Sequence, residues 1–422
     1  MQSSRTLAEW LAWMEAHHPR QIELGLERVA AVASRLTIDL SCSKIITVGG
    51  TNGKGSCVAF LEAILRAAGY RVGAYTSPHL LHYNERVRID GIAVDDAQLC
   101  DAFETVHAAL GAFSLTYFEF GTLAALWLFQ RAQLDVVILE VGLGGRLDAV
   151  NIIDPDVAVL TSIDLDHQDW LGTDRESIGA EKAGIFRAHK PAICVDEQPP
   201  RSVIDTAQKL GAQFFAVGSA FDYADHDATW CWSSTQLPRN ARYDDLPKPS
   251  LPLPSAAAAL AALHCLPLAI TSAAIAMGLR SASLAGRFQR IGCGAVEVIL
   301  DVGHNPHAAR WLAQRLAQTR TAGRTLAVFA MMADKDMAAV IDALKNYIEA
   351  WYIGALRDNP RAASVETVAQ VLQAQAVTNV VTANSVDDAY AKAIAQAQAG
   401  DRIVVFGSFF TVAAVLARLQ AK

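Results

Sequence analysis

A glycine-rich loop between an apolar run and a helical pattern constrains this chain more than any other feature. The loop reads Val48-Gly49-Gly50-Thr51-Asn52-Gly53-Lys54-Gly55-Ser56, with the apolar run at 45–48 and the helical pattern at 57–68. Glycines let backbone N–H groups turn toward an anion, the helix N-terminus adds partial positive charge, and Lys54 adds a full charge. The loop therefore predicts a site for ATP or GTP. The expected nucleotide contacts are Thr51, Asn52, Gly53, Lys54, Gly55 and Ser56.

The residue after Lys54 departs from the common phosphate-loop pattern. That pattern places Ser or Thr there, and the hydroxyl binds Mg²⁺. Here Gly55 occupies the position and Ser56 follows one residue late. A metal ion therefore needs ligands from elsewhere in the chain. The alternative interpretation, an ordinary turn between a strand and a helix, does not account for the placement of the lysine.

Length and composition indicate a two-domain globular protein. The chain has 422 residues, more than one typical core holds. A net charge of −7 without a basic run argues against nucleic acid as a partner. The seven cysteines form no CxxC pair, which is typical of reduced thiols. No signal pattern is present, and the longest apolar region, 256–277, is interrupted by His264 and Pro267. We expect a cytoplasmic monomer without a membrane span.

Apolar spacing predicts an α/β fold in the first part of the chain. Helices are predicted at 7–16, 25–35 and 118–131, and strands at 45–48, 72–76, 136–140 and 157–161. Short β-branched strands of this kind are typical of a doubly wound, mostly parallel sheet covered on both faces. A proline-rich stretch at 222–254 predicts a small antiparallel insertion and a connector, after which Ser255 is expected to cap an alanine-rich helix.

A second alternation of strands and helices begins after Gly286. Its predicted strands are 296–300, 326–329, 377–381 and 403–406, and its helices include 306–318 and 385–397. We therefore expect a P-loop ATPase domain at 1–286 and a smaller Rossmann-like α/β domain at 287–422.

Polar residues follow several predicted strands, at the edge where open α/β sheets bind ligands. Ser77 follows one strand, Glu140 ends another, and His167 comes shortly after a third. A hydroxyl, a carboxylate and an imidazole together can supply the missing Mg²⁺ ligands. Taken singly, Ser77 is equally a turn residue and His167 a hydrogen-bonded loop histidine. From the residues alone, Lys182 beside Glu181 reads as part of a plain salt bridge.

The second domain carries three further candidates. Asp301 and His304 follow a predicted strand and should share its edge. Arg287 lies at the domain junction, where an arginine can neutralise charge during phosphoryl transfer. The alternative for Arg287 is a linker salt bridge.

Eight motifs in a fixed order carry a resemblance that spans nearly the whole chain. The chain resembles the bacterial bifunctional dihydrofolate synthase / folylpolyglutamate synthase family, which is related to the Mur ligases. The motifs are Gly50–Ser56, Thr76–Leu80, Leu115–Glu119, Glu140–Asp148, Leu165–His167, Glu181–Ile185, Gly286–Phe288 and His304–Pro306.

The resemblance implies an ATP-dependent ligase that joins L-glutamate to dihydropteroate and to tetrahydrofolates. ATP phosphorylates the acid to an acyl phosphate, which the glutamate amine then attacks. It also implies two Mg²⁺ ions, leaves room for a monovalent cation, and implies that Lys182 is carbamylated. The implied metal ligands are Ser77, Glu140, His167 and Lys182, and the implied catalytic residues are Lys54, Lys182 and His304.

The resemblance further assigns the substrate contacts. It places the pterin at Thr116, Tyr117, Phe118, Glu119 and Leu147, and the incoming glutamate at His304 and Ser408. It places ATP also against Ser255, Arg287 and Asp301. Relatives often carry Asn where this chain has Ser255, whose side chain is shorter.

Two alternatives share part of this pattern. A Mur ligase acting on a UDP-linked peptidoglycan precursor has the same ATPase logic but usually carries Thr directly after the loop lysine. A nucleotide-regulated binding module would not need metal, phosphate and hinge residues together. ATP turnover that requires both an acid acceptor and an amino acid separates the three.

Overall fold

The computed structural model describes residues 5–20, 22–319, 321–357 and 359–421. The chain divides into two compact units, Met1–Ser283 and Leu284–Lys422. Each unit is an α/β structure with its own sheet.

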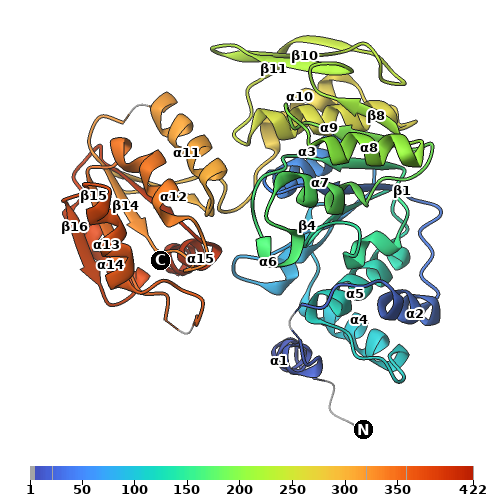
Figure 1. Ribbon diagram of the computed structural model, residues 1–422, viewed down its shortest axis with the longest axis horizontal. Helices are drawn as coiled ribbons and strands as arrows, with labels where there is room; N and C mark the ends of the chain where they lie inside the picture. The colour runs from blue at the N-terminus through green and yellow to red at the C-terminus, as the bar shows by residue number, and fades with distance from the viewer. Residues whose placement is uncertain (1–4, 21, 320, 358, 422) are drawn as a thin grey trace. The chain divides into compact units, whose positions relative to one another are not determined.

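The first unit runs from blue through green to yellow in Figure 1. It is built on an eight-stranded sheet with the order β4-β3-β2-β5-β1-β6-β7-β8. The neighbouring strands β2, β5, β1, β6, β7 and β8 pair in parallel. At one edge, β3 pairs antiparallel with β2, and β4 pairs antiparallel with β3. The predicted doubly wound, mostly parallel sheet is therefore confirmed. Its strands are β1 (Lys44–Gly49), β2 (Val72–Tyr75), β3 (Val87–Ile89), β4 (Ile92–Ala93), β5 (Val136–Glu140), β6 (Val157–Leu160), β7 (Pro191–Cys194) and β8 (Gln213–Ala216).

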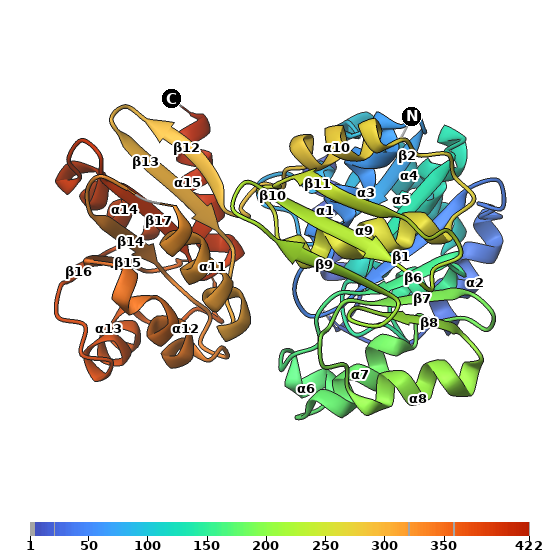
Figure 2. The same cartoon turned by 90° about the horizontal axis from the view of Figure 1, so that it is seen from above.

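Helices cover both faces of this sheet, because its central strands are apolar on both sides. On one side α3 (Lys54–Ala67) packs against α9 (Leu253–Cys265) and α10 (Ser272–Ser281). The helices that share a core with the opposite face are α1 (Leu7–His17), α2 (Glu27–Leu36), α4 (Asp96–Ala109), α5 (Tyr117–Ala132), α7 (Arg175–Ala183) and α8 (Arg201–Leu210). A small antiparallel sheet of β9 (Phe221–Asp225), β10 (Thr229–Ser234) and β11 (Arg242–Pro247) lies by α9 and α10 (Figure 2).

Two helix starts differ from the predictions. Helix α9 begins at Leu253 with Pro252 as its N-cap residue, so Ser255 lies inside the first turn and the predicted Ser255 cap is wrong. A first turn tolerates proline because its leading N–H groups have no partner in the helix. Helix α3 begins at Lys54, earlier than the apolar pattern indicated, because Gly53 at φ 87° turns the chain directly into it.

The second unit contains a six-stranded sheet with the order β12-β13-β17-β14-β15-β16, in which only β12 is antiparallel. One face of the sheet shares a core with α11 (Pro306–Gln318), α12 (Met337–Leu344) and α13 (Val365–Ala374). Outside this core, α14 (Val386–Gln396) packs against α15 (Phe409–Gln420). The strands are β12 (Gln289–Cys293), β13 (Val296–Asp301), β14 (Thr325–Phe329), β15 (Ala350–Gly354), β16 (Val380–Ala383) and β17 (Arg402–Phe406).

The predicted strand at 377–381 is wrong at its start. Val377 donates its N–H to the Leu372 carbonyl at 3.0 Å and so closes the end of α13. Strand β16 begins only at Val380, where pairing with β15 becomes available. The pairing strand β15 itself was not predicted.

Candidate active site

The glycine-rich loop between β1 and α3 is held by the segment that follows β6. Thr51 N donates to Ser162 O at 2.6 Å, and Asn52 N donates to Ser162 Oγ at 3.0 Å. Thr161 Oγ1 donates to Asn52 O at 2.6 Å, and Asp164 N donates to Thr51 Oγ1 at 3.0 Å. The loop is therefore fixed before any ligand binds, which spares the ordering cost at binding.

Two glycines are required by the path of this loop. Gly50 has φ 138°, and a Cβ there would lie 2.0 Å from Thr161 Oγ1. Gly53 has φ 87°, and a Cβ there would lie 2.9 Å from Ser255 Oγ. The buried Ser255 hydroxyl donates to Gly53 O at 3.2 Å. Ser255 thus supports the loop backbone, and its contact with ATP stays a prediction.

Two lysines converge on one carbonyl oxygen of the loop. Lys54 Nζ donates to Gly50 O at 3.0 Å, and Lys182 Nζ donates to the same oxygen at 3.1 Å from helix α7. Lys182 is only 5% exposed. Its burial, followed by the nearby Lys54 charge, lowers the pKa of Lys182 to about 7, although Asp166 and Asp148 oppose this shift. A neutral amine is therefore well populated at neutral pH.

The salt bridge expected for Lys182 is wrong. Its sequence neighbour Glu181 instead pairs with Arg146 at 2.7 Å, which leaves Lys182 directed at the loop. Close packing of α7 on the loop after β5 sets this geometry, since a Cβ on Gly145 would lie 2.8 Å from the Lys182 carbonyl oxygen.

Ser77 and Glu140 are neighbours at the carboxyl ends of β2 and β5. Glu140 is 5% exposed, and its Oε2 accepts the Ser77 N–H at 3.2 Å. His167 lies at the start of the short helix α6 (Gln168–Leu171) with φ 52°, and its side chain is 45% exposed. Within the described ranges, no three His, Cys, Asp or Glu side chains are grouped so as to hold a metal ion. Of the four predicted ligands, only Glu140 and His167 are of these residue types. The predicted site therefore also depends on the Ser77 hydroxyl and on Lys182.

The predicted pterin segment forms the first turn of α5. Thr116 is the N-cap residue: its hydroxyl accepts the Glu119 N–H at 3.3 Å, and the Glu119 carboxylate accepts the Thr116 N–H at 2.8 Å. The same carboxylate pairs with Arg28 at 2.9 Å. Glu119 therefore has a structural role, and its contact with a pterin ring stays a prediction.

The aromatic residues of this segment remain partly exposed. Phe118 lies against Gly142, where a Cβ would come within 2.6 Å of the ring. The ring centroid of Tyr117 lies 5.7 Å from that of Tyr83. Leu147 is half-buried in the same loop as Gly142. These side chains offer flat apolar surface of the kind that binds an aromatic ring.

Asp148 is a buried acid for which no role was predicted. Its carboxylate accepts the Leu143 N–H at 2.8 Å and the Val150 N–H at 3.1 Å. Burial raises the pKa of Asp148 to about 6, whereas the backbone N–H groups and Lys54 lower it. Asp148 is the last residue of the Glu140–Asp148 motif, and its burial and hydrogen bonds show that it holds this loop together.

In the second unit, the residues near Asp301 form a separate cluster. The Asp301 carboxylate ends β13 and accepts the Phe288 N–H at 2.9 Å and the Gly303 N–H at 2.8 Å. Burial raises the pKa of Asp301, and the Arg287 charge opposes this. His304 Nδ1 lies 3.0 Å from the Val302 carbonyl oxygen.

The loop after β17 joins this cluster. Gly407 N donates to Gly303 O at 3.2 Å, which brings Ser408 beside the Asp301 loop. Ser408 is buried and caps α15, accepting the Thr411 N–H at 3.0 Å. The Arg287 guanidinium lies 5.2 Å from the Phe409 ring centroid. The fold therefore brings together Arg287, Asp301, His304 and Ser408. The placement of Asp301 and His304 at the same strand edge had been predicted.

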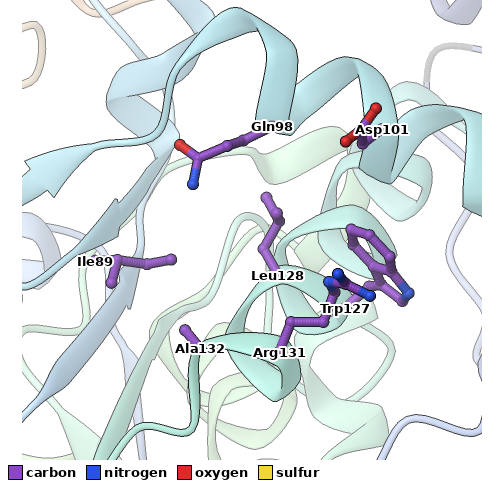
Figure 3. A pocket seen from close by; sticks show the side chains of 7 residues that line it. All are labelled: Ile89, Gln98, Asp101, Trp127, Leu128, Arg131 and Ala132. Atoms are coloured by element: carbon purple, nitrogen blue, oxygen red, sulfur yellow. The ribbon is translucent and has the colours of Figure 1, made fainter.

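The open pocket in Figure 3 is distinct from the predicted pterin segment. It lies beside Trp127 and Arg131, at the far end of α5 from Tyr117, about 15 Å along the helix axis. None of the helices in the described residues is long and apolar enough to cross a membrane.

Comparisons with known proteins find matches over most of the chain. The Mur ligase middle domain matches residues 48–231, and the Mur ligase glutamate ligase domain matches residues 286–409. The dihydrofolate synthase/folylpolyglutamate synthase of Escherichia coli K12 is 48% identical over 421 residues, covering 100% of this chain and 97% of that protein.

Solved structures are similar over the same length. An E. coli structure in complex with DHPP and ADP has a TM-score of 0.93 at 48% identity, covering 100% of this chain and 99% of that one. A bifunctional folylpolyglutamate synthase/dihydrofolate synthase with Mn, AMPPNP and L-glutamate bound has a TM-score of 0.92, with 48% identity and coverage of 100% and 99%. This chain therefore belongs to the dihydrofolate synthase/folylpolyglutamate synthase family of Mur ligase relatives.

Proposed function

We propose that this chain is an ATP-dependent ligase that adds L-glutamate to dihydropteroate and, as a second activity, to tetrahydrofolates. The relatives with these names and bound molecules support the assignment. The observation that carries it is the convergence of Lys54 and Lys182 on Gly50 O, beside a loop built to bind phosphate.

The first step transfers a phosphoryl group. A carboxylate oxygen of the acid attacks the γ-phosphorus, the bond to the β-phosphate oxygen breaks, and ADP leaves with that electron pair. The backbone N–H groups of residues 50–56 and the Lys54 ammonium stabilise negative charge on the phosphates. Ser255, Arg287 and Asp301 contribute further ATP contacts in this proposal.

The second step forms the amide. The glutamate amine attacks the carbonyl carbon of the acyl phosphate, phosphate leaves, and the amine nitrogen loses a proton. His304 and Ser408 receive the glutamate in this proposal. Their proximity through the Gly407–Gly303 hydrogen bond supports a shared role.

The residues after β2 and β5 fit a divalent cation. Ser77 and Glu140 offer hydroxyl and carboxylate oxygens, which hard cations prefer, and His167 is the third proposed ligand. When bound, such an ion withdraws charge from the transferring phosphoryl group. Its identity as Mg²⁺, the presence of two ions, a monovalent cation, the monomeric state and the cytoplasmic location stay predictions.

The chemistry of Lys182 supports carbamylation. Carbon dioxide reacts with a neutral amine, and the pKa of Lys182 near 7 keeps that form available. The new C–N bond and the loss of one proton convert the neutral amine to a carbamate, which places a negative charge beside Lys54. We propose that this carbamate is a further metal ligand.

The test is ADP release with Mg²⁺-ATP and glutamate, using dihydropteroate, tetrahydrofolate or a UDP-muramoyl peptide as acceptor. Glutamate-dependent release is expected with the first two acceptors. Activity with the UDP-linked acceptor alone would replace the assignment with a peptidoglycan-precursor ligase. Lys54→Ala should lose most turnover while its unfolding midpoint stays near that of the unmodified protein.

A further inference from the structure

Arg86 is a buried guanidinium without a carboxylate partner in the part of the chain that the structure describes. It is 9% exposed and ends the short 3-10 helix Tyr83–Arg86. Its Nε donates to His79 Nδ1 at 2.9 Å. It also lies 5.3 Å and 5.5 Å from the ring centroids of Tyr83 and Tyr117. These partners are neutral, so they leave the charge uncompensated.

Other arginines of this chain show how unusual this environment is. Arg88 lies two residues further on and pairs with Glu62 at 2.9 Å. Arg402 is 5% exposed and its partners are neutral as well, but they are oxygen acceptors, the Thr325 hydroxyl and the carbonyl oxygens of Thr319 and Leu316. An uncompensated buried charge costs several kcal/mol. An anionic ligand offsets that cost, and Arg86 is suited to bind one.

The position of Arg86 indicates which anion. On one side, Tyr117 belongs to the segment proposed to bind the pterin ring. On the other, His79 follows Ser77 by two residues, and Ser77 contacts Glu140 at the proposed metal site. The guanidinium therefore contacts Tyr117 of the surface proposed for the ring and His79 of the segment that carries the proposed metal ligand Ser77.

We propose that Arg86 binds the carboxylate of the acid substrate, the group that attacks the γ-phosphorus. Dihydropteroate carries one carboxylate, at the opposite end of the molecule from its ring, so a substrate lying on Tyr117 directs that group away from the pterin surface. A planar guanidinium can hold both carboxylate oxygens and set their direction. It also offsets the repulsion between two anions that must meet for phosphoryl transfer. The inference rests on the proposed function.

The test compares binding of dihydropteroate and of its carboxamide, which lacks the charge, by isothermal titration of the full chain. The unmodified protein should prefer the acid by about 10- to 100-fold, and Arg86→Gln should lose this preference. Arg86→Lys should keep part of it. KM for dihydropteroate should rise in Arg86→Gln, whereas KM for ATP should change little.

Arg88→Gln is the matched control, because Arg88 lies on the same segment and its charge is already paired. It should keep the preference for the acid. An Arg86→Gln protein that keeps the preference for the acid, or whose affinity for the carboxamide also falls, would overturn the proposal. So would failure of both Arg86 variants to fold, because that result assigns Arg86 a structural role. If the unmodified protein shows no glutamate-dependent ADP release, the proposed function itself has failed.

Discussion

Replacing Lys182 with methionine should abolish turnover and yet stabilise the protein. Lys182 is 5% exposed, and burial lowers its pKa from 10.5 to about 7. Burying this lysine in its neutral form at pH 7.5 costs roughly 4 kcal/mol of folding free energy. The reason is that pH 7.5 lies about three units below the ordinary pKa of 10.5, and each unit corresponds to about 1.4 kcal/mol. The lost hydrogen bond to Gly50 O offsets about 1 kcal/mol of the gain. We expect a net increase of about 2–3 kcal/mol in the free energy of unfolding.

The sign of the pH dependence follows from the direction of the shift. Between pH 7 and 10.5 the unfolded lysine binds a proton that the folded one has lost. The stability of the unmodified protein therefore rises with pH in this window, whereas Lys182→Met lacks this contribution. The difference between the two proteins should shrink by about 2 kcal/mol from pH 7.5 to pH 9.

The assay is urea unfolding in buffers freed of carbon dioxide, at several values of pH from 7 to 9. Added bicarbonate should stabilise the unmodified protein but not the variant, because a carbamate forms only on the folded lysine. Lys190→Met is the control, since Lys190 is half-exposed and pairs with Asp156 at the surface, so its loss should change stability by less than about 0.5 kcal/mol. A destabilised Lys182→Met, or a stability difference that does not vary with pH, would refute the reasoning.

Three further outcomes are expected. Gly50→Ala should remove nucleotide binding, because its Cβ would lie 2.0 Å from Thr161 Oγ1, whereas Gly292→Ala, which meets nothing within 4 Å, should leave binding by titration unchanged. Glu140→Ala should weaken the Mg²⁺ dependence of turnover far more than pterin binding; an unchanged Mg²⁺ titration would contradict the metal assignment. Burial is the chief cause that lowers the pKa of His264 to about 4, so between pH 6.5 and 4 the unfolded histidine binds a proton that the folded one does not. The free energy of unfolding of the unmodified protein should therefore fall by about 1–3 kcal/mol over this range. His264→Phe should lose less over the same range, and equal losses in chemical unfolding would show that His264 does not control this transition.

The sequence determined the features that depend on near neighbours in the chain. The glycine loop before α3 follows from residues whose backbone freedom and charge are local properties. The parallel strands were evident from short β-branched runs, and their carboxyl ends indicated that Ser77 and Glu140 would meet. The order of the motifs indicated the family to which the chain belongs.

The tertiary structure decided the contacts between segments far apart in the chain. Lys182 beside Glu181 reads as a surface ion pair, but close packing of α7 gives Glu181 to Arg146 and directs Lys182 to Gly50. Ser255 supports Gly53 from inside a helix that it was expected to cap. The residues next to Arg86 in the sequence do not indicate its role. That role is inferred because Arg86 is buried and has no carboxylate partner among the described residues. Burial and pairing arise only when the segments fold together, so a one-dimensional pattern cannot show which charges the fold leaves uncompensated.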